Sequence, residues 1–291
     1  MNKMTMKKRI YTLVLAVAGA AMLAVSCGPD EVVEPADPTY PVGGVMRQTV
    51  TITGPSGQKV DMEMVLVRGG LFYRGALPTD PEALDCERPM HPVLITSDYY
   101  ISAYEVTQEQ YEVLTGGQNP SVFARGGDYP VENVTYEEAE VFCQTLSNRT
   151  GSTFMLPTEA QWEYAARGGH FAPQEATLYA GSNHVERVAW YGANSELMPR
   201  RVGEKAPNAL GLYDMSGNVW EWCRDWYADT VYRNYVKDTA VNPYYNIEIE
   251  ERVIRGGGWN GATSSCRVSD RDHYVPTERA GYVGFRVVQE I

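Results

Sequence analysis

The sequence predicts an α+β domain with small sheets, a few short helices and long ordered loops. Three observations lead to this prediction: three helix starts that share one local signal, short strand-like segments near both ends, and no repeating alternation of strand and helix. After residue 170 the chain is rich in Gly, Asn, Pro and Tyr, which is typical of irregular connecting segments.

The first strand-like segments are Val50–Thr53 and Val60–Val67, where apolar and polar residues alternate. Three helices are then expected to begin at a threonine that is followed three residues later by Gln or Glu, because the two side chains satisfy free backbone N–H groups reciprocally. These threonines are Thr107, Thr135 and Thr158, and the second and third helices are expected to close at Gly151 and Gly168. Further short strands are expected at Val253–Arg255 and Gly284–Val288.

Composition restricts the possible partners. The chain has 291 residues, 25 Lys and Arg against 37 Asp and Glu, and a formal net charge of −12. With 44% hydrophobic and 21% charged residues, it is typical of a packed globular protein. An acidic chain repels phosphate backbones, so we expect no nucleic-acid partner.

The first 26 residues have the pattern of a bacterial export signal. A basic start that ends at Arg9 precedes the apolar run Tyr11–Val25, which is short for a membrane span. Small residues before Cys27 resemble the lipobox of lipoproteins, so we expect residues 1–26 to be removed and Cys27 to carry lipid. The alternative is an ordinary secretory signal in which Cys27 is incidental.

A tether is expected between this anchor and the folded domain. Residues 28–44 contain four prolines and four acidic residues without periodicity, which predicts a stiff, solvated segment. Gly28 after the cysteine resembles lipoproteins sorted to the outer membrane, facing the periplasm or the outside. We therefore expect a lipidated tether over 27–44 and one domain over 45–291, with the lipid as its only membrane contact.

Four cysteines remain after Cys27: Cys86, Cys143, Cys223 and Cys266. An exported protein with four cysteines favours disulfides, but four cysteines allow three pairings. There is no Cys-x-x-Cys motif and only four His residues, so a zinc site is not indicated.

Several motifs resemble the formylglycine-generating enzyme (sulfatase-modifying factor) family. The strongest are the LPTEAQWEYAARGG segment at 156–169, the NALGLYDMSGNVWEW segment at 208–222 and RVIRGGGW at 252–259. Weaker matches lie at 104–111, 130–134 and 284–286, all in family order. The resemblance implies an irregular variant of the C-type-lectin-like fold, with low regular structure and small antiparallel sheets. It also implies an enzyme that oxidises a cysteine in Cys-x-Pro-x-Arg peptides to formylglycine, with oxygen and a Cu(I) ion held by two thiolates.

The chain departs from the family pattern at the copper site. Gly261 stands at the first copper-cysteine position and Cys266 at the second, while Gly258 replaces a serine and Tyr282 an asparagine. One thiolate cannot form the two-thiolate site that Cu(I) prefers. We therefore expect Cys266 to be a catalytic remnant and the oxidase activity to be lost.

The resemblance also implies contacts for the remaining cysteines. It places Trp222 near the Gly-Gly-x-Trp strand, so a Cys223–Cys266 disulfide is one hypothesis and two buried free thiols are the other. Cys143 matches a family cysteine whose partner position is Val287 here, so it is either free or paired with Cys86.

A calcium site is implied by the same resemblance. The backbone around Gly217 and Val219 and the side chains of Asn218 and Glu221 match the family's second calcium site, and hard oxygen ligands suit Ca²⁺. The alternative is that Asn218 caps a turn and that Glu221 pairs with Arg224 or Arg255.

Two functions follow from these expectations. The first is a binding or scaffold module for a peptide, a glycan or an envelope protein partner. Its cleft is expected to be lined by Trp259, Asn260, Arg267, Arg271, Tyr274 and Tyr282, although the charged residues are equally compatible with a solvated face. The second is a formylglycine-generating oxidase that uses Cu(I) in an altered site.

Overall fold

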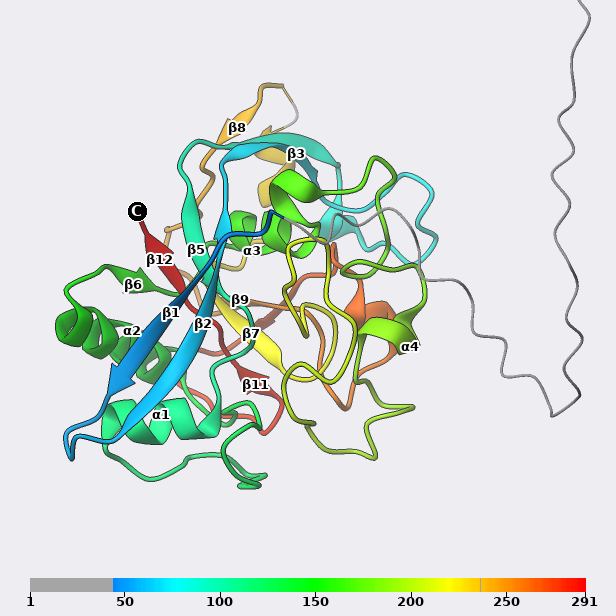
Figure 1. The fold of residues 1–291 in the computed structure, drawn as a ribbon. Helices are drawn as coiled ribbons and strands as arrows, with labels where there is room; N and C mark the ends of the chain where they lie inside the picture. The colour runs from blue at the N-terminus through cyan, green and yellow to red at the C-terminus, as the bar shows by residue number, and fades with distance from the viewer. Residues whose placement is uncertain (1–43, 236) are drawn as a thin grey trace, which may run out of the picture. The chain divides into compact units, whose positions relative to one another are not determined.

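The computed structural model describes residues 44–235 and 237–291, which fold into three small β-sheets joined by long loops (Figure 1). The predicted signal peptide (1–26), the lipidated Cys27 and all of the predicted tether except Gly44 lie outside the described residues. Among the described residues, no helix has both the length and the apolar character needed to cross a bilayer.

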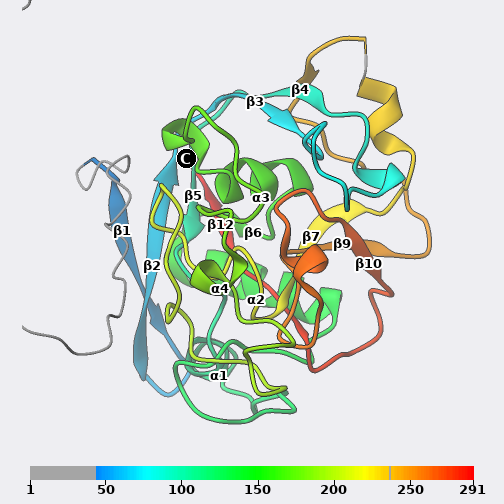
Figure 2. The same cartoon turned by 90° about the vertical axis from the view of Figure 1, so that its right-hand side faces the viewer.

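The largest sheet has five antiparallel strands in the order β1-β2-β5-β12-β6. They are β1 (Arg47–Thr53), β2 (Lys59–Val67), β5 (Tyr99–Ser102), β12 (Val288–Glu290) and β6 (Phe154–Met155). Strands β1 and β2 form the long hairpin at one margin of the molecule (Figure 2). The first two predicted strands are confirmed, each slightly longer than expected.

The second sheet has the order β10-β9-β7-β11, with β11 parallel to β7 and the other pairs antiparallel. Its strands are β10 (Asp272–Tyr274), β9 (Arg252–Arg255), β7 (Trp220–Trp226) and β11 (Val283–Gly284). Most residues of β7 are buried, Glu221 and Asp225 included. Buried carboxylates require partners, and these partners organise the site described below.

The third sheet has the order β3-β4-β8. It consists of β3 (Gly70–Arg74), β4 (His91–Ile95) and β8 (Ala240–Val241).

The helices follow the predicted capping signals. They are α1 (Gln108–Thr115), α2 (Tyr136–Thr150), α3 (Glu159–Ala166) and the one-turn α4 (Val185–Val188). Thr107, Thr135 and Thr158 are the N-caps of the first three, each within a reciprocal capping box. Gly151 ends α2 in the left-handed conformation, and Gly168, with φ of 98°, follows the C-cap of α3. Short 3-10 turns complete the inventory: η1 (Asp85–Glu87), η2 (Gly169–Phe171), η3 (Val231–Tyr235) and η4 (Thr263–Cys266).

One predicted strand is divided in the structure. Gly284–Val288 was expected to be continuous, but β11 ends at Gly284 and pairs with β7, whereas β12 begins at Val288 and pairs with β5 and β6. The intervening Arg286 is fully buried and reaches Glu221 of β7. The chain therefore passes from the second sheet to the first at this point, which local alternation does not indicate.

Two apolar clusters fill the space between the sheets and helices. One contains Phe142 of α2 and Trp222 of β7, and the other contains Trp162 of α3 and Cys223 of β7. Because side chains alternate along a strand, the two neighbours Trp222 and Cys223 face opposite clusters. The architecture confirms the predicted α+β class with short helices and long loops.

Candidate functional site

The loop after β9 occupies the place where the sequence predicts the copper remnant. Gly256 and Gly257 have φ angles of 98° and 82°, which residues with a Cβ atom rarely adopt. A Cβ atom on Gly257 would lie 2.7 Å from the carbonyl oxygen of Ser265, so glycine allows the two arms of the loop to pack closely. The chain then enters η4, which ends at Cys266.

The thiol of Cys266 is buried and uncharged. The residue is 0% exposed and packs in a small apolar cluster with Tyr179, Val185 and Val188. Burial raises the pKa of this thiol to about 12, because apolar surroundings disfavour the thiolate. Copper is bound by thiolates rather than thiols, so a metal ion at Cys266 would have to displace the thiol proton.

Gly261 supplies no ligand at the first copper position. Its N–H donates to the carbonyl oxygen of Gly258 at 2.8 Å, and its own carbonyl accepts from the N–H of Gly192 at 2.9 Å. One thiolate is missing and the other thiol is neutral, so the residues present do not fit a two-thiolate copper ion. Among the described residues, no group of three or more His, Cys, Asp or Glu side chains is arranged to hold a metal ion.

The hypothesised Cys223–Cys266 disulfide is not formed. Cys86, Cys143, Cys223 and Cys266 are all free thiols in the structure. Cys223 faces the cluster beneath α3, opposite to Trp222, whereas Cys266 belongs to a separate cluster. The prediction was wrong because two backbone segments that approach each other need not direct their side chains to the same face. The alternative of two buried thiols is the observed one.

Arg267 and Arg271 do not line a ligand cleft. Arg267 is 1% exposed, and its guanidinium contacts Glu87 at 2.7 Å and Asp80 at 2.8 Å. Arg271 is 3% exposed and binds both carboxylate oxygens of Glu159, at 2.5 and 2.9 Å. An enclosed guanidinium that is already paired is not available to a ligand, so both predictions are corrected to structural roles.

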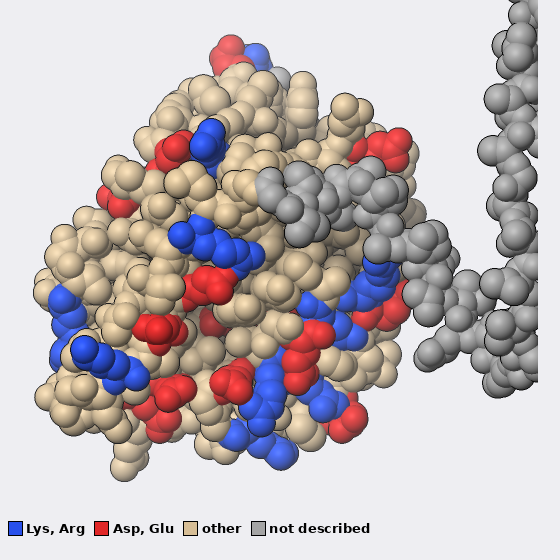
Figure 3. Space-filling view, viewed as in Figure 1, with Lys and Arg blue, Asp and Glu red and all other residues tan. Residues whose placement is uncertain are grey.

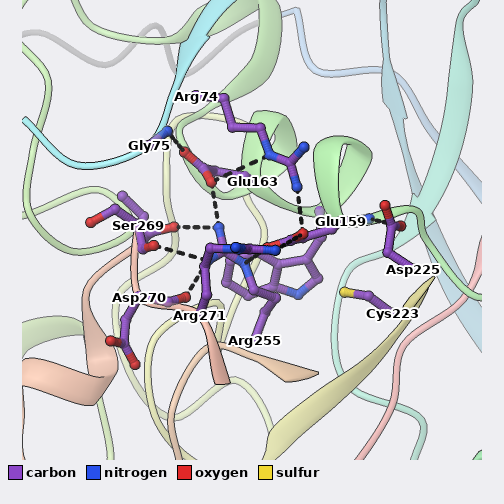
Figure 4. A network of polar contacts seen from close by, with 12 residues as sticks. Arg74, Gly75, Glu159, Glu163, Cys223, Asp225, Arg255, Ser269, Asp270 and Arg271 are labelled. Atoms are coloured by element: carbon purple, nitrogen blue, oxygen red, sulfur yellow. Dashed lines mark hydrogen bonds and ion pairs between the residues drawn. The ribbon is translucent and has the colours of Figure 1, made fainter. Parts of the chain in front are cut away.

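The carboxylates of α3 are the centre of a buried charge network (Figure 4). Glu159 and Glu163 lie one helical turn apart and therefore share a face of the helix. Glu159 contacts Arg271 and also Arg74 of β3 at 2.6 Å, while Glu163 pairs with Arg255 of β9. The network thus joins α3 to β3, to β9 and to the segment that precedes β10.

Both helix carboxylates are held in the ionised form. Burial by itself raises the pKa of Glu159, but the guanidiniums of Arg271, Arg74 and Arg255 outweigh burial and hold it well below its usual range. Burial likewise opposes ionisation of Glu163, and the neighbouring guanidiniums lower its pKa as well. Neither glutamate was predicted as a site residue. The available signal was the pair of glutamates four residues apart in a helix whose other residues are mostly apolar.

Four half-buried aromatic side chains meet in two pairs and are together called here the aromatic surface: Phe123, Trp259, Tyr274 and Tyr282. The rings of Phe123 and Trp259 meet edge to face with centroids 5.2 Å apart, and those of Tyr274 and Tyr282 meet at 6.1 Å. The indole N–H of Trp259 donates to the carbonyl oxygen of Gly281 at 2.8 Å, which links the two pairs. Asn260 is exposed next to Trp259. Phe123 was not predicted, since nothing local in the sequence relates it to Trp259.

A buried carboxylate holds the loop that carries Phe123. Glu132 is 0% exposed, and one of its oxygens accepts from the backbone N–H of Phe123 at 2.7 Å. Its other oxygen has no hydrogen-bond partner among the described residues. Burial raises the pKa of this carboxyl to about 7. The position of Phe123, and so one edge of the aromatic surface, depends on Glu132.

The predicted calcium residues are engaged by protein donors. The carboxylate of Glu221 accepts from Arg286 at 2.6 and 2.7 Å and from the indole of Trp162 at 2.6 Å. The side-chain oxygen of Asn218 accepts from the N–H of Arg200 at 2.9 Å. Glu221 therefore pairs with an arginine, as the alternative to calcium predicted. The partner is Arg286, whereas the sequence had suggested Arg224 or Arg255.

Two backbone N–H groups of this segment are also bonded, although calcium would use its carbonyl oxygens. The N–H of Gly217 donates to Gly256 at 2.7 Å, and that of Val219 donates to the buried Glu105 at 3.0 Å. A calcium ion would need Glu221 to leave Arg286, so the side chains do not fit Ca²⁺ in this arrangement. Calcium binding here stays a prediction.

Three buried aspartates differ electrostatically from the glutamates of α3. Burial raises the pKa of Asp214 to about 6, of Asp225 to about 6 and of Asp270 to about 7. Guanidiniums near them lower these values only in part. The folded protein therefore takes up protons near neutral pH.

A family model for the sulfatase-modifying factor enzyme 1-like domain matches residues 51–291. The chain belongs to this family. The match includes α3, the Gly261–Cys266 loop and the aromatic surface.

Relatives with different names share the domain. The "Chaperone protein LppX" of Paenibacillus barcinonensis is 29% identical over 79% of this chain and 90% of its own length. The formylglycine-generating enzyme of Streptomyces coelicolor is 32% identical over 56% of this chain and 53% of its own length, so that match spans about half of the enzyme. Among solved structures, Treponema denticola variable protein 1 has a TM-score of 0.73 and 29% identity, with 84% of this chain and 99% of that chain covered. The predicted formylglycine-generating-enzyme-like fold is confirmed.

Replacement of Glu159 tests the importance of the buried network. The Glu159→Gln substitution leaves the guanidiniums of Arg74 and Arg271 without their main counter-charge, so we expect a loss of about 3–5 kcal/mol in the free energy of unfolding. Glu196→Gln is the matched control, because Glu196 is 75% exposed and its pair with Arg200 spans 2.9 Å at the surface; its cost should stay below about 1 kcal/mol. Urea unfolding measures both, and equal losses would contradict the network.

The opposite pKa shifts predict a stability maximum in mildly acidic solution. Asp214, Asp225 and Asp270 have raised pKa values, so the folded state binds more protons than the unfolded state, and stability should rise as the pH falls from about 8 to about 5. Glu159 and Glu163 have lowered values, so stability should be lost below about pH 4, where the unfolded chain takes up protons. Melting temperatures between pH 3 and 8, measured in steps of about one pH unit, test this. A steady fall from pH 8 to 5 contradicts it.

Proposed function

We propose that this chain is a lipid-anchored envelope protein whose family domain binds a partner through the aromatic surface and does not oxidise cysteine. The observation that carries the proposal is the altered copper position. Gly261 offers no ligand, and Cys266 is a buried thiol whose pKa lies at about 12. The fold is retained because its buried charges and clusters do not depend on the missing cysteine.

The aromatic surface supports a binding role. Tryptophan and tyrosine present an apolar body together with a polar tip, so they contact many ligands without a catalytic group. Their loops are fixed by the Trp259–Gly281 and Glu132–Phe123 hydrogen bonds, which reduces the entropy lost on binding. The relative in Paenibacillus barcinonensis is named a chaperone, and chaperones act by binding other proteins. A peptide, a glycan or an envelope protein is the class of ligand we propose.

The proposed location rests on the N-terminal sequence. Residues 1–26 match an export signal, Cys27 follows a lipobox-like segment, and the acidic Pro-rich residues after it match a tether. We place the anchor in the bacterial outer membrane. We propose no nucleic-acid partner, since the net charge is −12 and the face in Figure 3 intersperses Lys and Arg with Asp and Glu.

An oxidation assay tests the proposed loss of activity. The purified protein, reduced and supplied with Cu(I) and air, should leave a Cys-x-Pro-x-Arg peptide unoxidised by mass spectrometry, because the two-thiolate site is absent. The Streptomyces coelicolor enzyme serves as the active control. Aldehyde from the wild-type protein would overturn the proposal.

Two variants at the first copper position refine this assay. A Cβ atom on Gly261 would meet the carbonyl oxygen of Gly258 at 3.2 Å and the Cβ of Ser265 at 3.5 Å, so Gly261→Cys and its control Gly261→Ala require only small shifts. Aldehyde from Gly261→Cys alone would assign the loss to the missing thiolate.

Substitution on the aromatic surface tests the binding role. Peptide and glycan arrays probed with wild-type protein should give ligands whose binding falls about thirtyfold or more in Trp259→Ala, because aromatic residues at a binding centre carry about 2 kcal/mol or more. Tyr73→Ala is the control, since Tyr73 is 59% exposed on β3 and outside the aromatic surface. Ligands that bind both variants equally well would place the binding site elsewhere.

A further inference from the structure

A concave site lies beside the C-terminal end of β12, near the end marked C in Figure 1. It is a cavity of about 450 Å³ that opens to solvent, a size within the lower range of small-ligand pockets. Its walls come from the β4–β5 turn, the start of α3, β7 and the segment after β8. None of its lining residues belongs to the aromatic surface, so its test is independent of the function proposed above.

The floor of this pocket is rigid and its rim is polar. Tyr99 and Ile95 are the most buried of its lining residues, with exposures of 2% and 4%, and are taken as its floor. The Tyr99 hydroxyl donates to the backbone carbonyl of Gln161 at 2.8 Å, which fixes the floor to α3. A fixed floor under an open rim is suited to a ligand that enters a preformed site.

Arg224 of β7 differs from the buried arginines of this protein. Its guanidinium lies 4.8 Å from the ring centre of Tyr244 and donates to the sulfur of Met155 at 2.8 Å. No carboxylate within the described residues forms an ion pair with Arg224, whereas Arg255 and Arg286 are each paired with a glutamate. Thioether sulfur is a weak acceptor, so most of the five N–H donors of Arg224 remain available to a ligand.

Other groups on the rim complement these donors. The side-chain amide nitrogen of Gln161 and the hydroxyl of Ser97 make no hydrogen bond to another described residue, although the Gln161 oxygen accepts from Thr158 at 2.9 Å. Asp98 and Glu290 contribute carboxylate acceptors. The pocket therefore offers hydrogen-bond donors and acceptors together. Its charged side chains are one guanidinium, from Arg224, and two carboxylates, from Asp98 and Glu290.

An aromatic face completes the lining. Tyr244 is 37% exposed, so part of its ring is open to the pocket while Arg224 stacks against it. An apolar ligand would leave the guanidinium without partners, and an anion would meet the two carboxylates. A ring that carries several hydroxyls and one C–H face uses the donors, the acceptors and the aromatic ring at once.

We propose that this pocket binds an uncharged saccharide unit. Arg224 and Gln161 donate to its hydroxyl oxygens, Asp98 accepts from its hydroxyl groups, and Tyr244 packs against its C–H face.

Ligand-observed NMR with the purified protein tests the proposal. The probes are methyl α-mannopyranoside, methyl β-galactopyranoside, N-acetylglucosamine and sodium glucuronate, used separately. At least one of the three uncharged sugars should show saturation transfer, with a Kd of about a millimolar, as expected for a ligand of this size. Absence of transfer from all three, or transfer from glucuronate alone, overturns the proposal.

Matched variants place the binding in this pocket. Arg224→Gln should weaken binding of the sugar about tenfold or more, since hydrogen bonds to a charged group are strong. Tyr244→Ala should weaken it to a similar extent, because the aromatic face against which the sugar packs is removed. Arg233→Gln and Tyr73→Ala are exposed controls outside the pocket and should bind as the wild type does. The melting temperature of each variant confirms that it is folded. Binding that survives both pocket substitutions overturns the assignment.

Discussion

The buried charge network around α3 is the interaction on which the rest of the structure depends. Glu159 and Glu163 lie on one helix face, and the arginines that neutralise them come from β3, β9 and the segment before β10. Long loops have few regular backbone hydrogen bonds of their own, so buried ion pairs hold these loops in place. Each glutamate and arginine of the network requires its oppositely charged partner, because a single unpaired charge in this interior would be strongly destabilising.

The network also holds the loop that the sequence resemblance aligns with the family's copper site. The loop that contains Gly261 and Cys266 runs between Arg255 and Arg267, and both arginines are buried and ion-paired. The two ends of the loop are therefore held by contacts that involve neither copper position.

The two candidate binding regions differ in how the protein holds the side chains that would contact a ligand. On the aromatic surface, half-buried rings are fixed from below by hydrogen bonds such as that of Trp259 to Gly281. In the pocket beside β12, Arg224 forms no ion pair within the part of the chain that the structure describes, although the other charged residues of its strand are buried.

Local features were determined by the sequence alone: the N-caps Thr107, Thr135 and Thr158 and the glycine after α2. These follow from interactions within a few residues. The roles of Arg267 and Arg271 and the opposite directions of Trp222 and Cys223 were decided only by the tertiary structure. Arg271 meets Glu159 across 112 residues of sequence, and an arginine is a ligand contact or a structural cation according to which carboxylate the fold brings beside it.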